Sequence, residues 1–182
     1  MSCFKRHVCL NNCNDYDHTQ HYKFKYSNSC LSNLLQSSFK FDKIKSVLCI
    51  GVETGAYETV LCDKLLDVPN PILTDIDPKH ESVEKLSCVD AIAKYGHCVD
   101  ALMFCFPYFA ASGYDISGFN GKYIVFVGEM QYGGHTNPDE LLESIEEKFD
   151  LTECVQLDYT LTALYCLEQF CVFTRYDDGE LS

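Results

Sequence analysis

The sequence predicts a single α/β domain with a mostly parallel sheet, helices on both faces and an antiparallel hairpin at the C-terminal end. From Lys45 to Phe149, short apolar runs alternate with segments of helical periodicity, as in parallel sheets with crossover helices. The last two apolar runs are separated only by Tyr159 to Cys166, which is too short for a typical crossover helix. These two runs are therefore expected to pair as antiparallel strands. The length of 182 residues fits one domain.

Seven apolar segments have the length and the boundaries of strands. The first ends at Gly51, the fourth is stopped by Pro107, and the fifth follows a turn that ends at Gly121. The expected strands lie at about 46–50, 71–75, 82–86, 100–106, 122–128, 151–158 and 167–175.

Helices are expected between these strands, at about 56–66, 87–95 and 137–149. The second of them begins with a capping box, in which Ser87 is the N-cap and Asp90 follows three residues later, and it ends at Gly96. The third is expected to begin with Asn137 as its N-cap and Pro138 at its first position.

The composition argues against several classes of function. The formal net charge of -13 and the pI of about 4.7 argue against binding extended nucleic acid, which requires a basic face. No apolar run approaches the roughly 20 residues of a membrane span, so no membrane partner is expected. The polar N-terminal residues do not resemble a signal peptide, and a cytoplasmic location is expected. The 12 cysteines are then predicted to be reduced and to act mainly as small buried hydrophobic residues. The oligomeric state is not predicted.

Residues 1–40 are predicted to form an N-terminal extension with a short helix, and residues 41–182 to form the folded domain. The extension contains several side chains of the kinds that bind zinc. Their spacing matches no common zinc module, so no metal site is expected. These side chains are Cys3, His7, Cys9, Cys13, His18 and His21.

A glycine turn after the first strand is the main candidate for a ligand site. Gly51 and Gly55 lie between a strand and a helix, a layout that brings backbone N–H groups up to a ligand. Asp75 ends the second strand, where a carboxylate can bind ribose hydroxyls. The spacing does not fit G-x-G-x-x-G, which disfavours a nucleotide-binding oxidoreductase. Two alternatives remain open: the glycines form a plain tight turn, and Asp77, which precedes Pro78, competes with Asp75.

The segment Val47–Gly55 resembles motif I of class I S-adenosylmethionine-dependent methyltransferases, commonly written V-L-E-I-G-x-G-T-G. The resemblance implies a Rossmann-like seven-stranded methyltransferase sheet and S-adenosylmethionine as the cofactor. Cys49 replaces the usual acidic residue, and Glu53 replaces the middle glycine. The Glu53 carboxylate would lie near the methionine end of the cofactor, where it could hold the ammonium group. The expected cofactor-binding residues are Gly51, Glu53, Thr54, Gly55, Asp75, Leu86 and Ser87.

The methyl acceptor is expected near the ends of the fourth and fifth strands. Methyltransferases that act on amino nitrogens often carry N/D-P-P-Y/W after the fourth strand, and Pro107 and Tyr108 match the end of this motif. Aromatic residues here can stack on a planar substrate, or simply complete the core packing. The segment Val127–Thr136 resembles a G-E-x-x-G-G-x-T segment of poorly characterised methyltransferase-like proteins of protists and large DNA viruses. The candidate catalytic residues are Pro107, Tyr108, Glu129 and His135, the last as a general base.

Two functions remain in competition. The first is an S-adenosylmethionine-dependent methyltransferase whose acceptor is a small molecule, a protein segment or a nucleobase amino group. The second is a catalytically inactive binding protein with the methyltransferase fold, which Cys49 and Glu53 favour.

Overall fold

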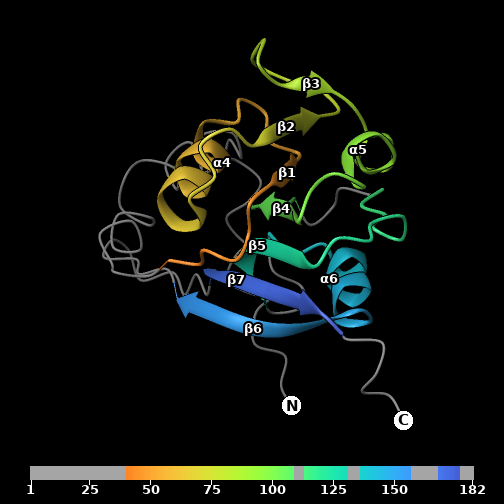
Figure 1. Cartoon of the computed structure of the whole chain (residues 1–182). Coiled ribbons are helices and arrows are strands. Elements are labelled where there is room, and N and C mark those ends of the chain that lie inside the picture. Colours follow the sequence, from red (N-terminus) through yellow and green to blue (C-terminus); the bar gives the residue numbers. More distant parts are fainter. Residues whose placement is uncertain (1–39, 109–112, 131–135, 157–167, 177–182) are drawn as a thin grey trace, which may run out of the picture.

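The computed structural model describes residues 40–108, 113–130, 136–156 and 168–176. The described strands form one seven-stranded sheet with the order β3-β2-β1-β4-β5-β7-β6 (Figure 1). The predicted N-terminal helix and the possible zinc ligands lie outside the described residues. The strands are β1 (Val47–Ile50), β2 (Ile72–Asp75), β3 (Glu84–Lys85), β4 (Ala101–Cys105), β5 (Tyr123–Glu129), β6 (Phe149–Gln156) and β7 (Glu168–Arg175).

The strand directions confirm the predicted Rossmann-like architecture. Strands β1 to β5 run parallel to one another wherever they pair. Strand β7 pairs antiparallel with both β5 and β6, so the C-terminal pair extends the parallel part of the sheet. Because β7 lies between β5 and β6, strand β6 forms one edge of the sheet, and β7, the last of the described strands, is internal.

Helices cover both faces of the sheet, as predicted (Figure 1). On one face, α4 (Ala56–Leu61) continues directly into the π-helix η2 (Cys62–Leu66). The opposite face is covered by α5 (Cys88–Tyr95) and α6 (Asp139–Glu146). Within the described residues, no helix has both the length and the apolar composition that a membrane span requires.

The capping predictions were correct for one helix and wrong for the other. Ser87 is the N-cap of α5, and its hydroxyl accepts a hydrogen bond of 3.2 Å from the Asp90 N–H. Helix α6 instead begins at Asp139, with Pro138 as its N-cap. The Asn137 side chain is buried (1% exposed), and within the described part of the chain its amide has no hydrogen-bond partner. It therefore does not cap the helix.

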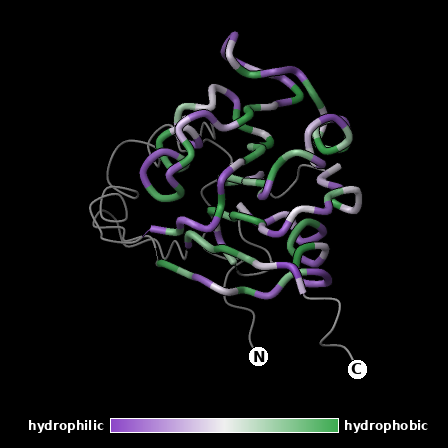
Figure 2. The backbone as a smooth tube through the Cα atoms, viewed as in Figure 1, coloured by the Kyte–Doolittle hydropathy of each residue, from purple (hydrophilic) through white to green (hydrophobic). Residues whose placement is uncertain are grey.

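Side chains on the two faces of the central strands belong to two separate hydrophobic cores. Along β1, Val47 and Cys49 face the α4 side, whereas Leu48 and Ile50 face the α5 side. Strand β4 is buried along its whole length, and the central strands are correspondingly hydrophobic in Figure 2. Both faces of such a strand must be apolar, because each is covered by helices.

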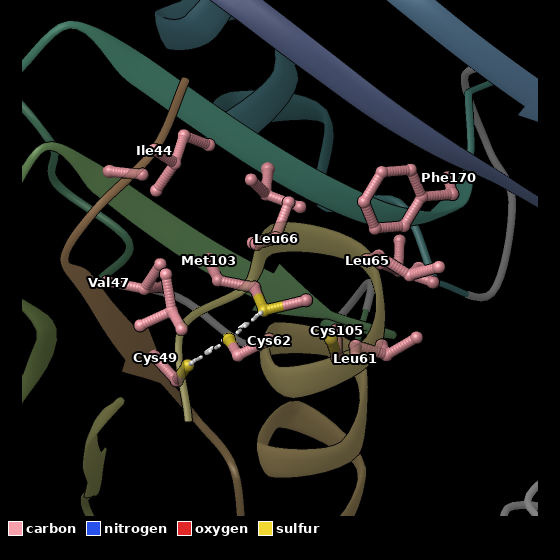
Figure 3. Close-up of a cluster of buried hydrophobic side chains, with 14 of the residues drawn as sticks. Ile44, Val47, Cys49, Leu61, Cys62, Leu65, Leu66, Met103, Cys105 and Phe170 are labelled. Atoms are coloured by element: carbon pink, nitrogen blue, oxygen red, sulfur yellow. Dashed lines mark hydrogen bonds between the residues drawn. The ribbon is translucent and has the colours of Figure 1, made fainter. Parts of the chain in front are cut away.

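Sulfur atoms pack together in the core beneath α4 (Figure 3). The Cys62 sulfur lies 3.5 Å from the Met103 sulfur and 3.9 Å from the Cys49 sulfur. Burial raises the pKa of the Cys49 thiol, which keeps it protonated and compatible with its apolar surroundings. At Cys49 and Cys62 the structure therefore agrees with the prediction that cysteines serve as small hydrophobic residues.

Candidate functional site

The predicted site residues lie at one end of the sheet, where the carboxyl ends of the parallel strands meet. The Gly51 N–H donates to the Thr74 carbonyl (2.9 Å), so the glycine turn begins beside the end of β2. The Leu86 N–H donates to the Asp75 carbonyl (2.9 Å), which places the start of the β3–α5 connection beside the same strand end. In an open parallel sheet, ligands bind at this carboxyl end of the strands.

The glycines of the turn are required by the backbone conformation and by close packing. Gly51 and Gly55 both have φ of 73°, in the left-handed region. A Cβ atom on Gly55 would lie only 2.5 Å from the Leu73 Cδ1 atom. The interpretation of Gly55 as part of a plain tight turn is therefore incomplete, because this residue also lets the turn pack closely against β2.

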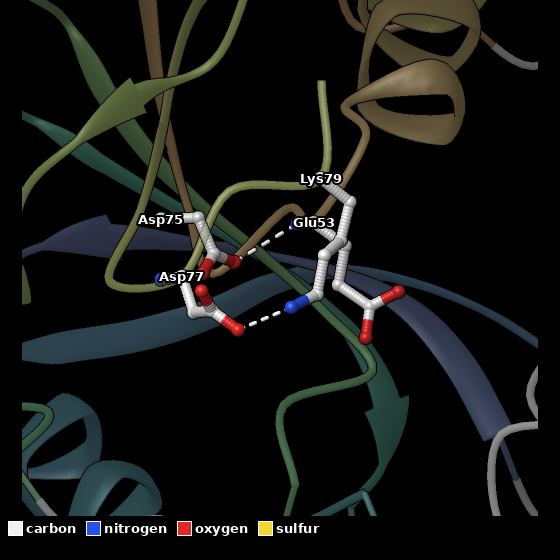
Figure 4. Close-up of polar contacts among 4 residues, drawn as sticks. All are labelled: Glu53, Asp75, Asp77 and Lys79. Atoms are coloured by element: carbon white, nitrogen blue, oxygen red, sulfur yellow. Dashed lines mark hydrogen bonds and ion pairs between the residues drawn. The ribbon is translucent and has the colours of Figure 1, made fainter. Parts of the chain in front are cut away.

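Asp75 fixes the shape of the turn through both of its carboxylate oxygens. One oxygen accepts a hydrogen bond of 2.8 Å from the Glu53 N–H (Figure 4). The other accepts one of 2.7 Å from the Asp77 N–H. The side chain is buried, with 8% of its surface exposed. Asp77 is exposed and forms an ion pair with Lys79. Of the two competing carboxylates, Asp75 is therefore the one built into the turn.

Glu53 occupies the turn in a strained conformation. Its φ of 49° lies in the left-handed region, which is uncommon for a residue with a side chain. Its N–H is held by Asp75, and its carbonyl accepts a hydrogen bond of 2.8 Å from the Lys79 N–H. The Glu53 carboxylate points away from Asp75 and Asp77 (Figure 4). The neighbouring Thr54 is exposed.

Glu58, in the first turn of α4, is a buried acid that the sequence interpretation missed. It is 3% exposed, and burial raises its pKa to about 8. The negative charges of Glu53 and Asp75 raise this pKa further, whereas a hydrogen bond from the Cys105 thiol lowers it. Glu58 is thus mostly protonated at neutral pH. Its spacing of three residues from the buried Leu61 was the available signal, since residues so spaced share a helix face.

Two further side chains at this end of the sheet were not predicted to belong to the site. Ile76 follows Asp75 directly and is 70% exposed, so a large apolar side chain lies in solvent beside the polar turn. Tyr114 packs edge-on against Phe104, with ring centroids 5.7 Å apart. The Tyr114 hydroxyl lies 3.4 Å from the position of a Cβ atom on Gly51, so it covers the start of the turn. Burial raises the Tyr114 pKa to about 12, so the hydroxyl remains a hydrogen-bond donor.

The ends of β4 and β5 carry the residues predicted for the acceptor side. Phe106 has φ of 50°, an outlier for a bulky residue, and its N–H donates to the Val127 carbonyl (2.6 Å). The chain changes direction at this strained residue. Pro107, which follows it, is buried, and Tyr108 is 39% exposed. Strained backbone of this kind is concentrated at functional sites.

Glu129, at the end of β5, is hydrogen-bonded to Thr136. Its N–H donates to the Thr136 hydroxyl (2.9 Å), and its carboxylate accepts a longer hydrogen bond of 3.4 Å from the Thr136 N–H. His135 lies outside the described residues, so the general-base prediction is not tested. Within the described ranges, no group of three or more histidine, cysteine or acidic side chains is arranged to hold a metal ion.

No protein-family model and no curated protein sequence matches the chain. Its structure is similar to that of the N-methyltransferase NodS from Bradyrhizobium japonicum WM9 in complex with S-adenosyl-L-homocysteine, with a TM-score of 0.47, 11% identity and 90% of each chain covered. It is also similar to a chain of a fibrillarin/Nop5p complex, with a TM-score of 0.49, 14% identity, and 83% of this chain and 82% of that chain covered. At such low identity, the function of this chain has to be inferred from its own residues.

Proposed function

We propose that this protein is an S-adenosylmethionine-dependent methyltransferase. The observation that carries the proposal is the hydrogen bond from the Glu53 N–H to the Asp75 carboxylate. This bond joins the glycine turn to the acidic residue at the end of β2, the two parts expected to hold the methionine and ribose portions of the cofactor.

The residues present fit the cofactor on chemical grounds. A carboxylate offers about four acceptor positions, and the two backbone hydrogen bonds to Asp75 leave acceptor capacity for ribose hydroxyls. The exposed Ile76 side chain supplies an apolar surface for the adenine base, with Leu86 and Ser87 on the adjoining backbone. The Tyr114 hydroxyl, which lies close to Gly51, would donate to the methionine carboxylate.

The charge of the turn favours this cofactor over a dinucleotide. Glu53 and Asp75 are acidic, and Lys79, which lies nearby, is paired with Asp77. The sulfonium and ammonium groups of S-adenosylmethionine are positive and would be attracted to these carboxylates. A dinucleotide pyrophosphate would be repelled. The same electrostatics disfavour the oxidoreductase alternative that the glycine spacing disfavours.

Catalysis would consist mainly of orientation and electrostatic stabilisation. The bound cofactor supplies an electrophilic methyl group, which an acceptor atom attacks in line. Tyr108, half-exposed at the end of β4, would stack on a planar acceptor, and Pro107 would fix its position. His135 would accept the single proton that the acceptor loses, and Glu129 would line the acceptor side at the end of β5. The acceptor is a small molecule, a basic protein segment or a nucleobase amino group.

Calorimetric titration tests the proposal. S-adenosylmethionine and S-adenosylhomocysteine should bind with micromolar dissociation constants, which correspond to about -8 kcal/mol at 1 μM. NAD serves as the matched control and should not bind. If neither sulfur compound binds to the folded protein, the proposal is wrong.

The strained Glu53 supports one alternative, a catalytically inactive binding protein with the same fold. Its side chain stands where a middle glycine would leave room for the cofactor. In the enzyme, the Glu53 carboxylate pairs with the cofactor's ammonium group. In an inactive relative, the same side chain obstructs the site and repels the methionine carboxylate.

The Glu53→Gly variant should distinguish the two functions. In both cases it should stabilise the fold by about 1 kcal/mol, because glycine adopts positive φ without strain. For an enzyme, S-adenosylmethionine should bind equally well or more weakly. A tenfold or larger gain in affinity, about 1.4 kcal/mol, would instead support the inactive protein. Asp67→Gly is the matched control, because Asp67 has φ of 58° but ends η2, away from the glycine turn.

A further inference from the structure

Two cysteines face each other across the C-terminal pair of strands. Cys154 on β6 is directly paired with Cys171 on β7, and their sulfur atoms lie 3.5 Å apart. Directly opposed residues on antiparallel strands have Cβ atoms about 4.5–5.5 Å apart, close to the separation that a disulfide requires. Bond formation from the present sulfur–sulfur distance of 3.5 Å would need side-chain rotation together with a small approach of the two strands.

The two thiols differ in their access to solvent. Cys154 is exposed on the edge strand, whereas Cys171 is 0% exposed. Burial, together with the neighbouring Cys154, raises the pKa of the Cys171 thiol, so this group stays protonated. A soluble oxidant would therefore meet Cys154 first, and Cys171 would be held within reach as the resolving thiol.

Among the cysteines that the structure describes, the others lack this combination. Cys49 and Cys62 have sulfur atoms 3.9 Å apart, but both residues are 0% exposed. Cys98 is exposed, but its thiol donates to the Tyr95 carbonyl oxygen (3.1 Å). Cys154 and Cys171 combine proximity with solvent access on one side of the pair.

We propose that Cys154 and Cys171 form a redox modification site, a thiol pair that a peroxide oxidises reversibly to a disulfide. The Cys154 sulfur attacks one peroxide oxygen, the O–O bond breaks, and the products are a sulfenic acid on Cys154 and one water. The Cys171 sulfur then attacks the Cys154 sulfur, the S–O bond breaks, and the departing hydroxide takes the Cys171 proton as a second water. The two thiols lose two electrons and two protons, and the peroxide is reduced to water.

The consequence would be a covalent link between the edge strand and the rest of the sheet. Cys171 is also paired with Phe126 of β5, so the link would tie β6 to a strand that borders the parallel sheet. The proposal does not depend on the methyltransferase function, because neither cysteine lies at the carboxyl ends of the parallel strands.

Peptide mapping of the full chain after treatment with hydrogen peroxide tests the proposal. The reduced protein is oxidised, remaining thiols are alkylated, and the chain is cleaved after Glu153, Asp158 and Glu168, which separates Cys154, Cys166 and Cys171 into three peptides. The expected result is a cross-linked pair of peptides containing Cys154 and Cys171, which dithiothreitol separates. Cys49 and Cys62 should be alkylated only after unfolding, and Cys98 should be oxidised without joining this link.

Two control variants keep the test decisive. In the Cys154→Ser variant, the Cys171 thiol should remain unmodified until the protein unfolds. The Cys166→Ser variant should still form the link, because Cys166 takes no part in it. The proposal is overturned if Cys98 is oxidised while Cys154 and Cys171 remain unlinked, or if Cys154 links to Cys166 instead. The wild-type map decides the question even if a variant does not fold.

Discussion

The free energy of unfolding should fall as the pH rises from about 5 to 8, by up to roughly 1.4 kcal/mol per pH unit, because of Glu58. The pKa of this carboxyl is raised from 4.5 to about 8 by burial in the folded protein. Between these two pH values the folded state binds a proton that the unfolded state has released. Stability is therefore greatest below the unfolded pKa and is lost as the pH rises through the folded pKa.

Chemical denaturation between pH 5 and pH 8.5 measures this effect. The Glu58→Gln variant keeps a neutral side chain of similar shape at every pH, so the difference in stability between wild type and variant should shrink or reverse as the pH rises. Glu143→Gln, an exposed position on α6, is the control and should leave the wild-type slope unchanged. An identical slope in wild type and Glu58→Gln would mean that Glu58 is not the linked group.

The Asp75→Asn variant should lose both stability and affinity for S-adenosylmethionine. Asp75 now accepts hydrogen bonds from two backbone N–H groups. In the variant, the side-chain amide nitrogen of asparagine would face one of these donors and could not accept its hydrogen bond. The negative charge that strengthens both bonds would also be lost. Losing a charge-assisted hydrogen bond costs about 1.5–3 kcal/mol, so the free energy of unfolding should fall by that amount. Affinity should fall by a further ~1–3 kcal/mol, or about 5- to 150-fold, because the ribose loses the same acceptor.

Denaturant unfolding and calorimetric titration separate the two effects. Asp77→Asn is the matched control, because Asp77 is exposed and its ion pair with Lys79 contributes little to stability. The titration is interpreted at a temperature at which Asp75→Asn remains folded. Unchanged affinity in the folded variant would show that the carboxylate shapes the turn without binding the ribose.

Local sequence patterns predicted much of the fold because they depend on neighbours in the chain. Ser87 and Asp90 form the predicted capping box, since a side chain at the N-cap needs only the backbone three residues away. The prediction for Asn137 was wrong because tertiary packing buried its side chain. A local pattern contains no information about such burial.

The same distinction holds at the candidate site. The sequence predicted Gly51, Gly55 and Asp75, because a glycine turn and a strand-ending carboxylate are visible in a short stretch of chain. Glu58 and Tyr114 were missed. The pKa of Glu58 is raised by burial and by the charges of Glu53 and Asp75, which belong to other elements. Tyr114 contacts the region of Gly51 from a segment about 60 residues further along the chain.

The sequence by itself determined the order of strands and helices, the parallel sheet with its antiparallel end, and the glycine turn, because periodicity and turn residues act over a few neighbours. It placed the end of the third helix too late, since that helix ends at Glu146 and Phe149 already begins β6. Only the tertiary structure decided that β7 lies between β5 and β6, which set Cys171 opposite Cys154. It also decided that Phe106 takes a left-handed conformation and that Asp75 clamps the turn through Glu53. These features depend on contacts between segments distant in the chain, and packing of the whole sheet fixes such contacts.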